Sequence, residues 1–180
     1  MKESEIKKYQ RLNELAEQNG IVIFGGNTDK ELPLCELRQS YNIEQKMYNR
    51  SISGLSVKDA ISAYDACVST LDPETVLLHI GMADLDLFST NSADFDNTYR
   101  AFISHIRSKN KGIRIAIISL KTKDGDPLIC EMNRHLKYIA ESEQCEYGDI
   151  EHTKLWNPKN TMSAAAFVAS LGFVHPLKYK

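Results

Sequence analysis

Short apolar runs alternate with longer amphipathic stretches along most of the 180-residue chain. In the runs at residues 21–24, 75–80 and 114–120 nearly every position is apolar. This pattern is typical of strands that are buried on both faces of a parallel sheet. Weaker runs at 46–48 and 145–150 predict two more strands, each bounded by polar residues. We therefore expect five strands.

Amphipathic helices are predicted between these strands, because apolar residues recur there at intervals of three and four. Ser56 is well placed to cap one of them, since its hydroxyl can accept a backbone N–H of the first turn. Pro127 suits the first turn of another, where its missing N–H costs nothing. The predicted helices cover residues 4–19, 34–37, 56–71, 92–110, 127–143 and 161–171.

The regular alternation of strands and helices predicts a parallel sheet, because parallel neighbours need a crossover connection that is usually a helix. Right-handed crossovers place helices on both faces. The expected fold is one α/β domain over residues 1–180, a three-layer α/β/α sandwich of the flavodoxin-like kind with a five-stranded parallel sheet. The helix within residues 1–20 is expected to pack on it. A chain of this length suits a single domain.

The charge and composition of the chain disfavour some classes of binding partner. The formal net charge is −2 and the basic residues are scattered, so we expect neither nucleic acid nor an anionic membrane surface as a partner. The N-terminus carries charges throughout and lacks the apolar stretch of a secretory signal. No apolar run approaches the roughly 20 residues that span a bilayer. These features favour a cytoplasmic protein.

The cysteines and acidic residues indicate no metal site or cofactor. Cys35, Cys67, Cys130 and Cys145 are isolated in sequence, so we interpret them as reduced and mostly buried thiols. The acidic residues near position 90 spell out no cation-binding loop and are interpreted as a solvated rim. They are Asp84, Asp86, Asp94 and Asp96.

Candidate chemistry lies at the predicted carboxyl ends of the strands, where ligands bind in sheets of this kind. Residues 25–29 read Gly-Gly-Asn-Thr-Asp and form a tight turn after the first strand. This turn lacks both the ending of a phosphate-binding P-loop and the third glycine of a dinucleotide-binding motif. Residues 49–54 read Asn-Arg-Ser-Ile-Ser-Gly, and residues 81–84 read Gly-Met-Ala-Asp. A His-Pro pair follows at 175–176.

The order of these four segments resembles the SGNH, or GDSL-like, hydrolase family, and the resemblance runs from about residue 21 to residue 176. In that family the first segment reads Gly-Asp-Ser, and the serine is the nucleophile. Its backbone N–H, the glycine N–H of the second segment and an asparagine side chain of the third form the oxyanion hole. A closing Asp-x-x-His supplies the orienting acid and the general base.

The resemblance leaves several catalytic positions filled by residues without the required chemistry. Asn27 stands at the serine position, Ala83 at the oxyanion asparagine and Gly172 at the closing aspartate, while Gly54 and His175 match. An amide has no ionisable O–H and cannot form an acyl-enzyme through oxygen. Losing one oxyanion donor costs about 100- to 1000-fold in comparable enzymes. The sequence therefore favours a non-catalytic binding or interaction protein.

The remaining positions of the segments match only in part. Gly25 matches the family, and Gly26 replaces its aspartate. The residues Gly81 and Asp84 also match. We expect a pocket for a small acyl or sugar-ester ligand, or for a protein partner. Its candidate binding residues are Gly26, Thr28, Gly54, Gly81, Ala83 and Asp84, with Asn27 and His175 at the former catalytic positions.

Several alternatives remain. An active ester hydrolase could use Thr28 as a substitute nucleophile, or water activated by His175. His175 could equally be a loop histidine bonded to backbone, and Asn27 a residue suited to a left-handed turn. Asp84 is more simply a brace that accepts backbone N–H bonds. A third interpretation is a flavodoxin-like domain that binds a nucleotide at the same strand ends. Separately, His79 lies inside the apolar run 75–80 and is interpreted as a core histidine bonded to a neighbour.

Overall fold

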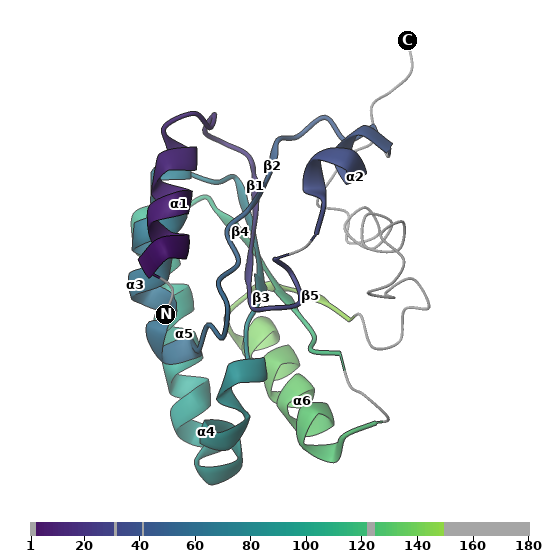
Figure 1. Ribbon diagram of the computed structural model, residues 1–180. Helices are drawn as coiled ribbons and strands as arrows, with labels where there is room; N and C mark the ends of the chain where they lie inside the picture. Colours follow the sequence, from purple (N-terminus) through teal and green to yellow (C-terminus); the bar gives the residue numbers. More distant parts are fainter. Residues whose placement is uncertain (1–2, 31, 41, 122–124, 150–180) are drawn as a thin grey trace.

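The computed structural model describes residues 3–149 except 31, 41 and 122–124. Its five strands form one sheet in the order β2-β1-β3-β4-β5, and every neighbouring pair is parallel (Figure 1). The strands are β1 Ile21–Gly25, β2 Met47–Asn49, β3 Thr75–His79, β4 Arg114–Ile118 and β5 Glu146–Gly148. The predicted five-stranded parallel α/β fold is confirmed. The predicted helix 161–171, Gly172 and His175 lie outside the described residues.

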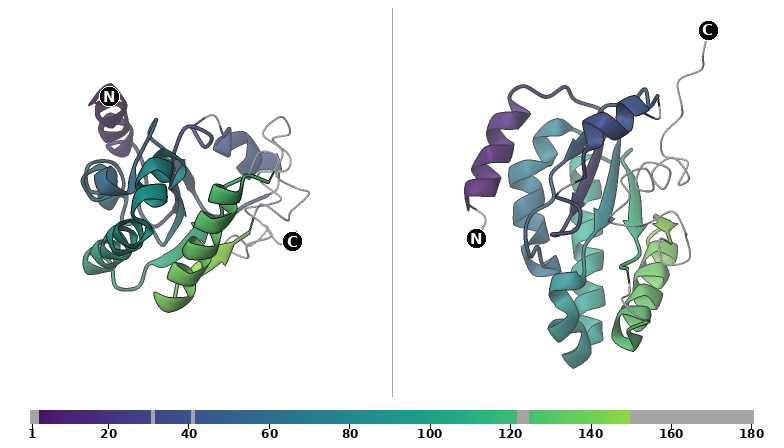
Figure 2. Two further views of the ribbon diagram at one scale, coloured as in Figure 1. Left: turned by 90° about the horizontal axis from the view of Figure 1, so that it is seen from below. Right: turned by 45° about the vertical axis from the view of Figure 1, so that its right-hand side comes forward.

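Helices cover both faces of the sheet. The helices α3, α5 and α6 pack side by side, α1 packs on the outside of α3, and α2 lies across the sheet from them (Figures 1 and 2). Two short 3-10 turns, η1 Ser69–Leu71 and η2 Met82–Asp84, follow α3 and β3. The helices are α1 Glu3–Asn13, α2 Leu34–Ser40, α3 Val57–Cys67, α4 Leu85–Thr90, α5 Ser92–Lys109 and α6 Pro127–Ser142.

The main core lies between the sheet and the helices α3, α5 and α6. Alternate strand residues such as Val22 and Phe24 face these helices, and the Phe24 ring meets those of Tyr64 and Phe102 at centroid distances of 6.0 and 6.1 Å. The intervening residues, such as Ile23, are also buried. Burial on both faces explains why the strands read as continuous apolar runs rather than as alternating ones.

Among the described helices, three ends differ from the sequence prediction by three residues or more, and one of them is that of α2, which extends to Ser40 rather than to 37. The first helix ends at Asn13, not at 19, and the Asn13 side chain donates hydrogen bonds to the Cys67 carbonyl and the Thr70 hydroxyl. The helix α3 ends at Cys67, not at 71, and the chain continues only as the η1 turn. The predicted cap is confirmed, since the Ser56 side chain accepts the Asp59 N–H. Tertiary contacts, which periodicity does not contain, set these ends.

The helix α4 was not predicted. It covers only Leu85–Thr90, directly after the η2 turn and before Asn91, whose side chain caps α5. Six residues are too few for a periodic pattern, and isolated helices of this length are unstable in water. Packing of α4 against α5 and α6, with Phe88 buried, stabilises it.

None of the described helices is long and apolar enough to cross a membrane. The four cysteines are free, as expected, but the prediction that they are mostly buried is wrong. Only Cys67 is buried, Cys130 and Cys145 are half-buried, and Cys35 is exposed on α2.

Candidate functional site

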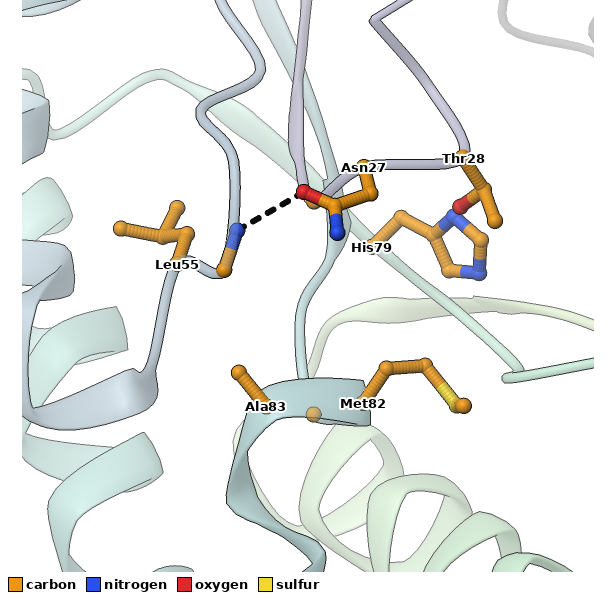
Figure 3. Close-up of a pocket in the computed structure, with 9 residues that line it drawn as sticks. Asn27, Thr28, Leu55, His79, Met82 and Ala83 are labelled. Carbon is orange, nitrogen blue, oxygen red and sulfur yellow. Dashed lines mark hydrogen bonds between the residues drawn. The ribbon is translucent and has the colours of Figure 1, made fainter. Parts of the chain in front are cut away.

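The strand order 2-1-3-4-5 reverses direction between β1 and β3, and ligands bind at such switch points. Gly25 at the end of β1 pairs in register with His79 at the end of β3. The turns that follow these two strands therefore face each other. Between them and the segment before α3 lies a pocket of about 340 Å³ (Figure 3). Its lining residues are Gly26, Asn27, Thr28, Gly54, Leu55, His79, Gly81, Met82 and Ala83.

The fold thus brings together most of the residues that the sequence singled out. Gly26, Thr28, Gly54, Gly81 and Ala83 line the pocket around Asn27. Asp84 is not among the lining residues. Its neighbours Met82 and Ala83 are exposed, which leaves the methionine side chain and the alanine methyl at the mouth of the pocket.

The Asn27 side chain is bonded across the pocket. Its Oδ1 accepts the backbone N–H of Gly54 at 2.9 Å (Figure 3). This N–H is the donor that the resemblance assigns to the oxyanion hole. Asn27 is not among the described residues with a positive φ, so the left-handed turn conformation that asparagine tolerates does not explain its presence. The amide instead joins the first and second segments of the site.

The turn itself is held by a buried Asp29–His79 pair. Asp29 Oδ1 lies 2.8 Å from His79 Nδ1, and its Oδ2 accepts the Gly26 N–H at 3.1 Å. Burial alone lowers the pKa of His79, but the charge of Asp29, its hydrogen bond and a bond to the Ser119 backbone raise that pKa above its ordinary value. The predicted core histidine is therefore confirmed, and its ionic partner is Asp29.

Sequence reasoning did not identify Asp29 as a structural group. It is the last residue of the tight turn, two positions after Asn27, and looks like another polar turn residue. The pairing with position 79 depends on the register of β1 and β3, which sets Gly25 opposite His79 and so brings the turn after β1 beside this histidine. A buried histidine inside an apolar strand was the only signal in the sequence that an acid had to lie nearby.

Thr28 has no activating base among the described residues. Its side chain makes no hydrogen bond to a histidine or a carboxylate in that part of the chain. His79, the histidine of the pocket, is engaged with Asp29 and the Ser119 backbone. A threonine hydroxyl needs a neighbouring base to become a nucleophile.

Asp84 braces the site from beneath. Both of its carboxylate oxygens accept the backbone N–H of Val57, the first residue of α3, at 3.1 and 3.0 Å. The predicted role as an acceptor of backbone N–H bonds is confirmed, although the donor comes from another segment. The expectation of a solvated rim is wrong for Asp84, which is only 3% exposed. Burial raises its pKa to about 6, although the Val57 hydrogen bond opposes the shift.

Gly81 is required at the start of the third segment. Its φ is 145°, and a Cβ there would lie 2.9 Å from Leu120 Cδ1 and 3.1 Å from Met132 Sδ. Asn133 fixes Leu120 in turn, because its side-chain amide bonds the N–H and the C=O of that residue, each at 2.7 Å. The loop after β4 and the helix α6 thus shape the floor behind the pocket.

The described part of the chain offers no set of side chains that could bind a metal ion. No cluster there brings together three or more His, Cys, Asp or Glu side chains that could hold an ion. The acidic residues near position 90 are instead engaged individually, for example Asp94 with Lys58 at 3.3 Å and Asp96 with His135 at 2.9 Å.

Comparison with known proteins gives similarity in structure but not in sequence. No family model matches the chain, and no curated protein matches it. A Streptococcus pneumonia protein provisionally described as a platelet activating factor superposes with a TM-score of 0.79 at 16% identity, covering 94% of this chain and 91% of that one. An acetyl xylan esterase gives 0.68 at 14% identity, covering 83% and 98%.

A GDSL-like lipase from Bacteroides thetaiotaomicron gives a TM-score of 0.63 at 16% identity, covering 93% of this chain and 97% of that one. At such identities the likeness concerns the fold. It agrees with the resemblance that the four sequence segments suggested. The chain therefore has the three-layer α/β/α fold of the SGNH, or GDSL-like, hydrolases.

Proposed function

We propose that this chain is a non-catalytic member of the SGNH-fold proteins and that it binds a small acyl or sugar-ester ligand, or a protein partner, in the pocket at the ends of β1 and β3. The hydrogen bond from the Gly54 N–H to Asn27 Oδ1 carries the proposal. In a hydrolase of this plan the nucleophile would stand at 27, and the Gly54 N–H would be open to the substrate oxygen.

Replacement of the serine by Asn27 changes two roles at once. The position loses its nucleophile, because the carboxamide of Asn27 has no ionisable O–H with which to attack an ester carbonyl. The same side chain also accepts the Gly54 N–H through Oδ1, so a substrate carbonyl would have to displace this oxygen to reach the donor. Ala83, on the opposite wall, offers a methyl group where an amide would complete the hole. The first change removes the attacking group, and the other two weaken stabilisation of the developing oxyanion.

The pocket remains suited to binding. A volume of about 340 Å³ lies at the lower end of small-molecule sites. Leu55, Met82 and Ala83 supply apolar wall, while the Thr28 hydroxyl and the Asn27 amide supply polar contacts. Figure 3 shows the Asn27 amide nitrogen directed toward the side formed by Met82 and Ala83, where it can donate to a ligand carbonyl. The acetyl xylan esterase of the same fold motivates acetylated sugars as first probes.

The experiment combines turnover and labelling. Purified protein is assayed with p-nitrophenyl acetate and acetylated xylo-oligosaccharides and is treated with a fluorophosphonate probe, next to Asn27→Ala. We expect no turnover above the buffer rate and no labelled band in either protein. Ester turnover by the wild type that Asn27→Ala abolishes would refute the proposal, because it would make Asn27 a catalytic group.

Binding is measured separately, by titration of the acetylated oligosaccharides against the wild type and against Ala83→Trp. Ala83 is exposed at the pocket wall, so an indole there fills the cavity without replacing a core side chain. Loss of binding in Ala83→Trp supports the pocket as the site. Binding that is unchanged in this variant contradicts a ligand role for the pocket.

The second candidate is an active ester hydrolase with a non-standard site, which the Thr28 hydroxyl on the pocket wall favours. Its nucleophile would be Thr28, or water that His175 activates as the general base. Thr28→Val and His175→Ala test it on any ester that the wild type hydrolyses. If both variants keep the wild-type rate, the activity has another origin and this candidate fails.

A further inference from the structure

A second groove, of about 370 Å³, lies at the β2 edge of the sheet. Residues of α1, of β2, of α2 and of the segment before α2 line it, and it shares no lining residue with the pocket around Asn27. Nothing in the proposed function uses this groove. Its most unusual member is Arg50, the residue that directly follows β2.

Arg50 is buried with its charge. The residue is only 5% exposed, and its guanidinium lies 5.3 Å from the ring centre of Tyr9 and 5.4 Å from that of Tyr48. Nε donates to Asn13 Oδ1 at 2.8 Å, and Nη1 donates to the Asn49 carbonyl at 2.9 Å. The aromatic faces and these neutral acceptors orient the planar group between α1 and β2.

One edge of the guanidinium remains available. Among the described residues, Nη2 has no hydrogen-bond acceptor, and no carboxylate forms an ion pair with Arg50. Burial accordingly lowers the pKa of this guanidinium, and only weak charge effects from Tyr9, Cys67 and Tyr48 oppose that shift. Buried charges in proteins are ordinarily paired, because taking an ion out of water is costly. An anion in the groove would supply the missing partner.

The surroundings of Arg50 favour an anion with an apolar body. The groove is lined by three cationic side chains, those of Lys8, Lys30 and Arg50, and by the carboxylate of Glu36. Lys30 is already paired with the Glu5 carboxylate, so Lys8 and Arg50 are the cations that face a ligand. Its apolar wall includes Leu12, which is 42% exposed although it lies on the side of α1 that faces the groove. A short aliphatic chain could cover such a wall while its head group meets the cations.

We propose that this groove binds a small organic oxyanion, a carboxylate or a phosphate monoester on a short aliphatic chain, with the head group at Nη2 of Arg50 and near Lys8. The bonds that Arg50 makes to Asn13 and Asn49 hold α1 against β2 and do not involve Nη2. The structural role and the binding role therefore use different edges of one side chain.

The test is a titration followed by amide NMR shifts, with hexanoate and hexyl phosphate as oxyanion arms and 1-hexanol as the neutral arm. We expect saturable shifts at residues such as Leu12 and Asn49 with a Kd of about 1 mM, a typical affinity for a ligand of this size. The two oxyanion arms decide which head group is preferred. Saturation by neither oxyanion, or equal saturation by hexanol, overturns the proposal.

Charge reversal on exposed positions provides the matched comparison. Lys8→Glu lies in the groove, and Lys137→Glu lies on the exposed side of α6, far along the chain from it. We expect Lys8→Glu to weaken oxyanion binding by about fivefold or more, and Lys137→Glu to leave it unchanged at moderate salt. Equal effects of the two reversals overturn the proposal. Arg50→Lys, if it folds by circular dichroism, should abolish binding; the Lys8 pair decides the question if it does not fold.

Discussion

The buried carboxylate of Asp84 should make the free energy of unfolding depend on pH. Its carboxylate is 3% exposed, and its bonds to the Val57 N–H do not compensate for burial, so its pKa is about 6 instead of the model-peptide 3.8. An acid whose pKa is raised by folding binds its proton more tightly in the native state than in the unfolded state. The native state therefore loses stability as the pH rises from about 4 to about 6.

The magnitude follows from the size of the shift. A difference of about two pH units corresponds to about 3 kcal/mol of unfolding free energy, at 1.36 kcal/mol for each unit. Asp84→Asn removes the titration and keeps one amide oxygen as an acceptor for the Val57 N–H. We expect the free energy of unfolding of the variant, relative to wild type, to rise by about 3 kcal/mol between pH 4 and pH 7.

Urea unfolding followed by circular dichroism at several pH values measures this difference. Other carboxylates titrate in both proteins, so their effects cancel in the comparison. Asp86→Asn, an exposed residue at the start of α4, controls for the loss of one negative charge. A difference between Asp84→Asn and wild type that stays constant over the whole pH range would refute the reasoning about burial.

Three further predictions concern the pocket and its turns. Gly81→Ala should lower the unfolding free energy by about 2–3 kcal/mol in thermal melts, because φ is 145° and the methyl would meet Leu120 at 2.9 Å. The control Gly26→Ala should cost little, because its Cβ would meet nothing within 4 Å. Similar losses in the two variants would contradict the steric requirement at Gly81. Asp29→Asn should cost about 3 kcal/mol and lower the pKa of His79, read by NMR titration, and an unchanged pKa would contradict the ion pair. Asn27→Ala should speed hydrogen exchange at the Gly54 amide by about fivefold, as the loss of one hydrogen bond implies, and unchanged exchange would exclude this bond in solution.

The fold was predictable because its signals are local and strong. The run 21–24 is apolar at every position, the run 75–80 is apolar except at the buried Thr75 and His79, and the helices between the runs have clear periodicity. The short helix α4 and the early end of α1 were not predictable. Their boundaries depend on contacts of Phe88 and Asn13 with residues far away in the sequence.

The site was predictable as a place and as a set of residues, but not in its connections. By itself the sequence determined the approximate strand ends and the identity of the turn residues Asn27 and Ala83, since these depend only on order along the chain. Only the tertiary structure decided that Asn27 bonds Gly54, that Asp29 pairs with His79 and that Asp84 holds α3. These bonds join residues 27, 50 and 27 positions apart, and sheet register and helix packing, which no local pattern encodes, bring them together.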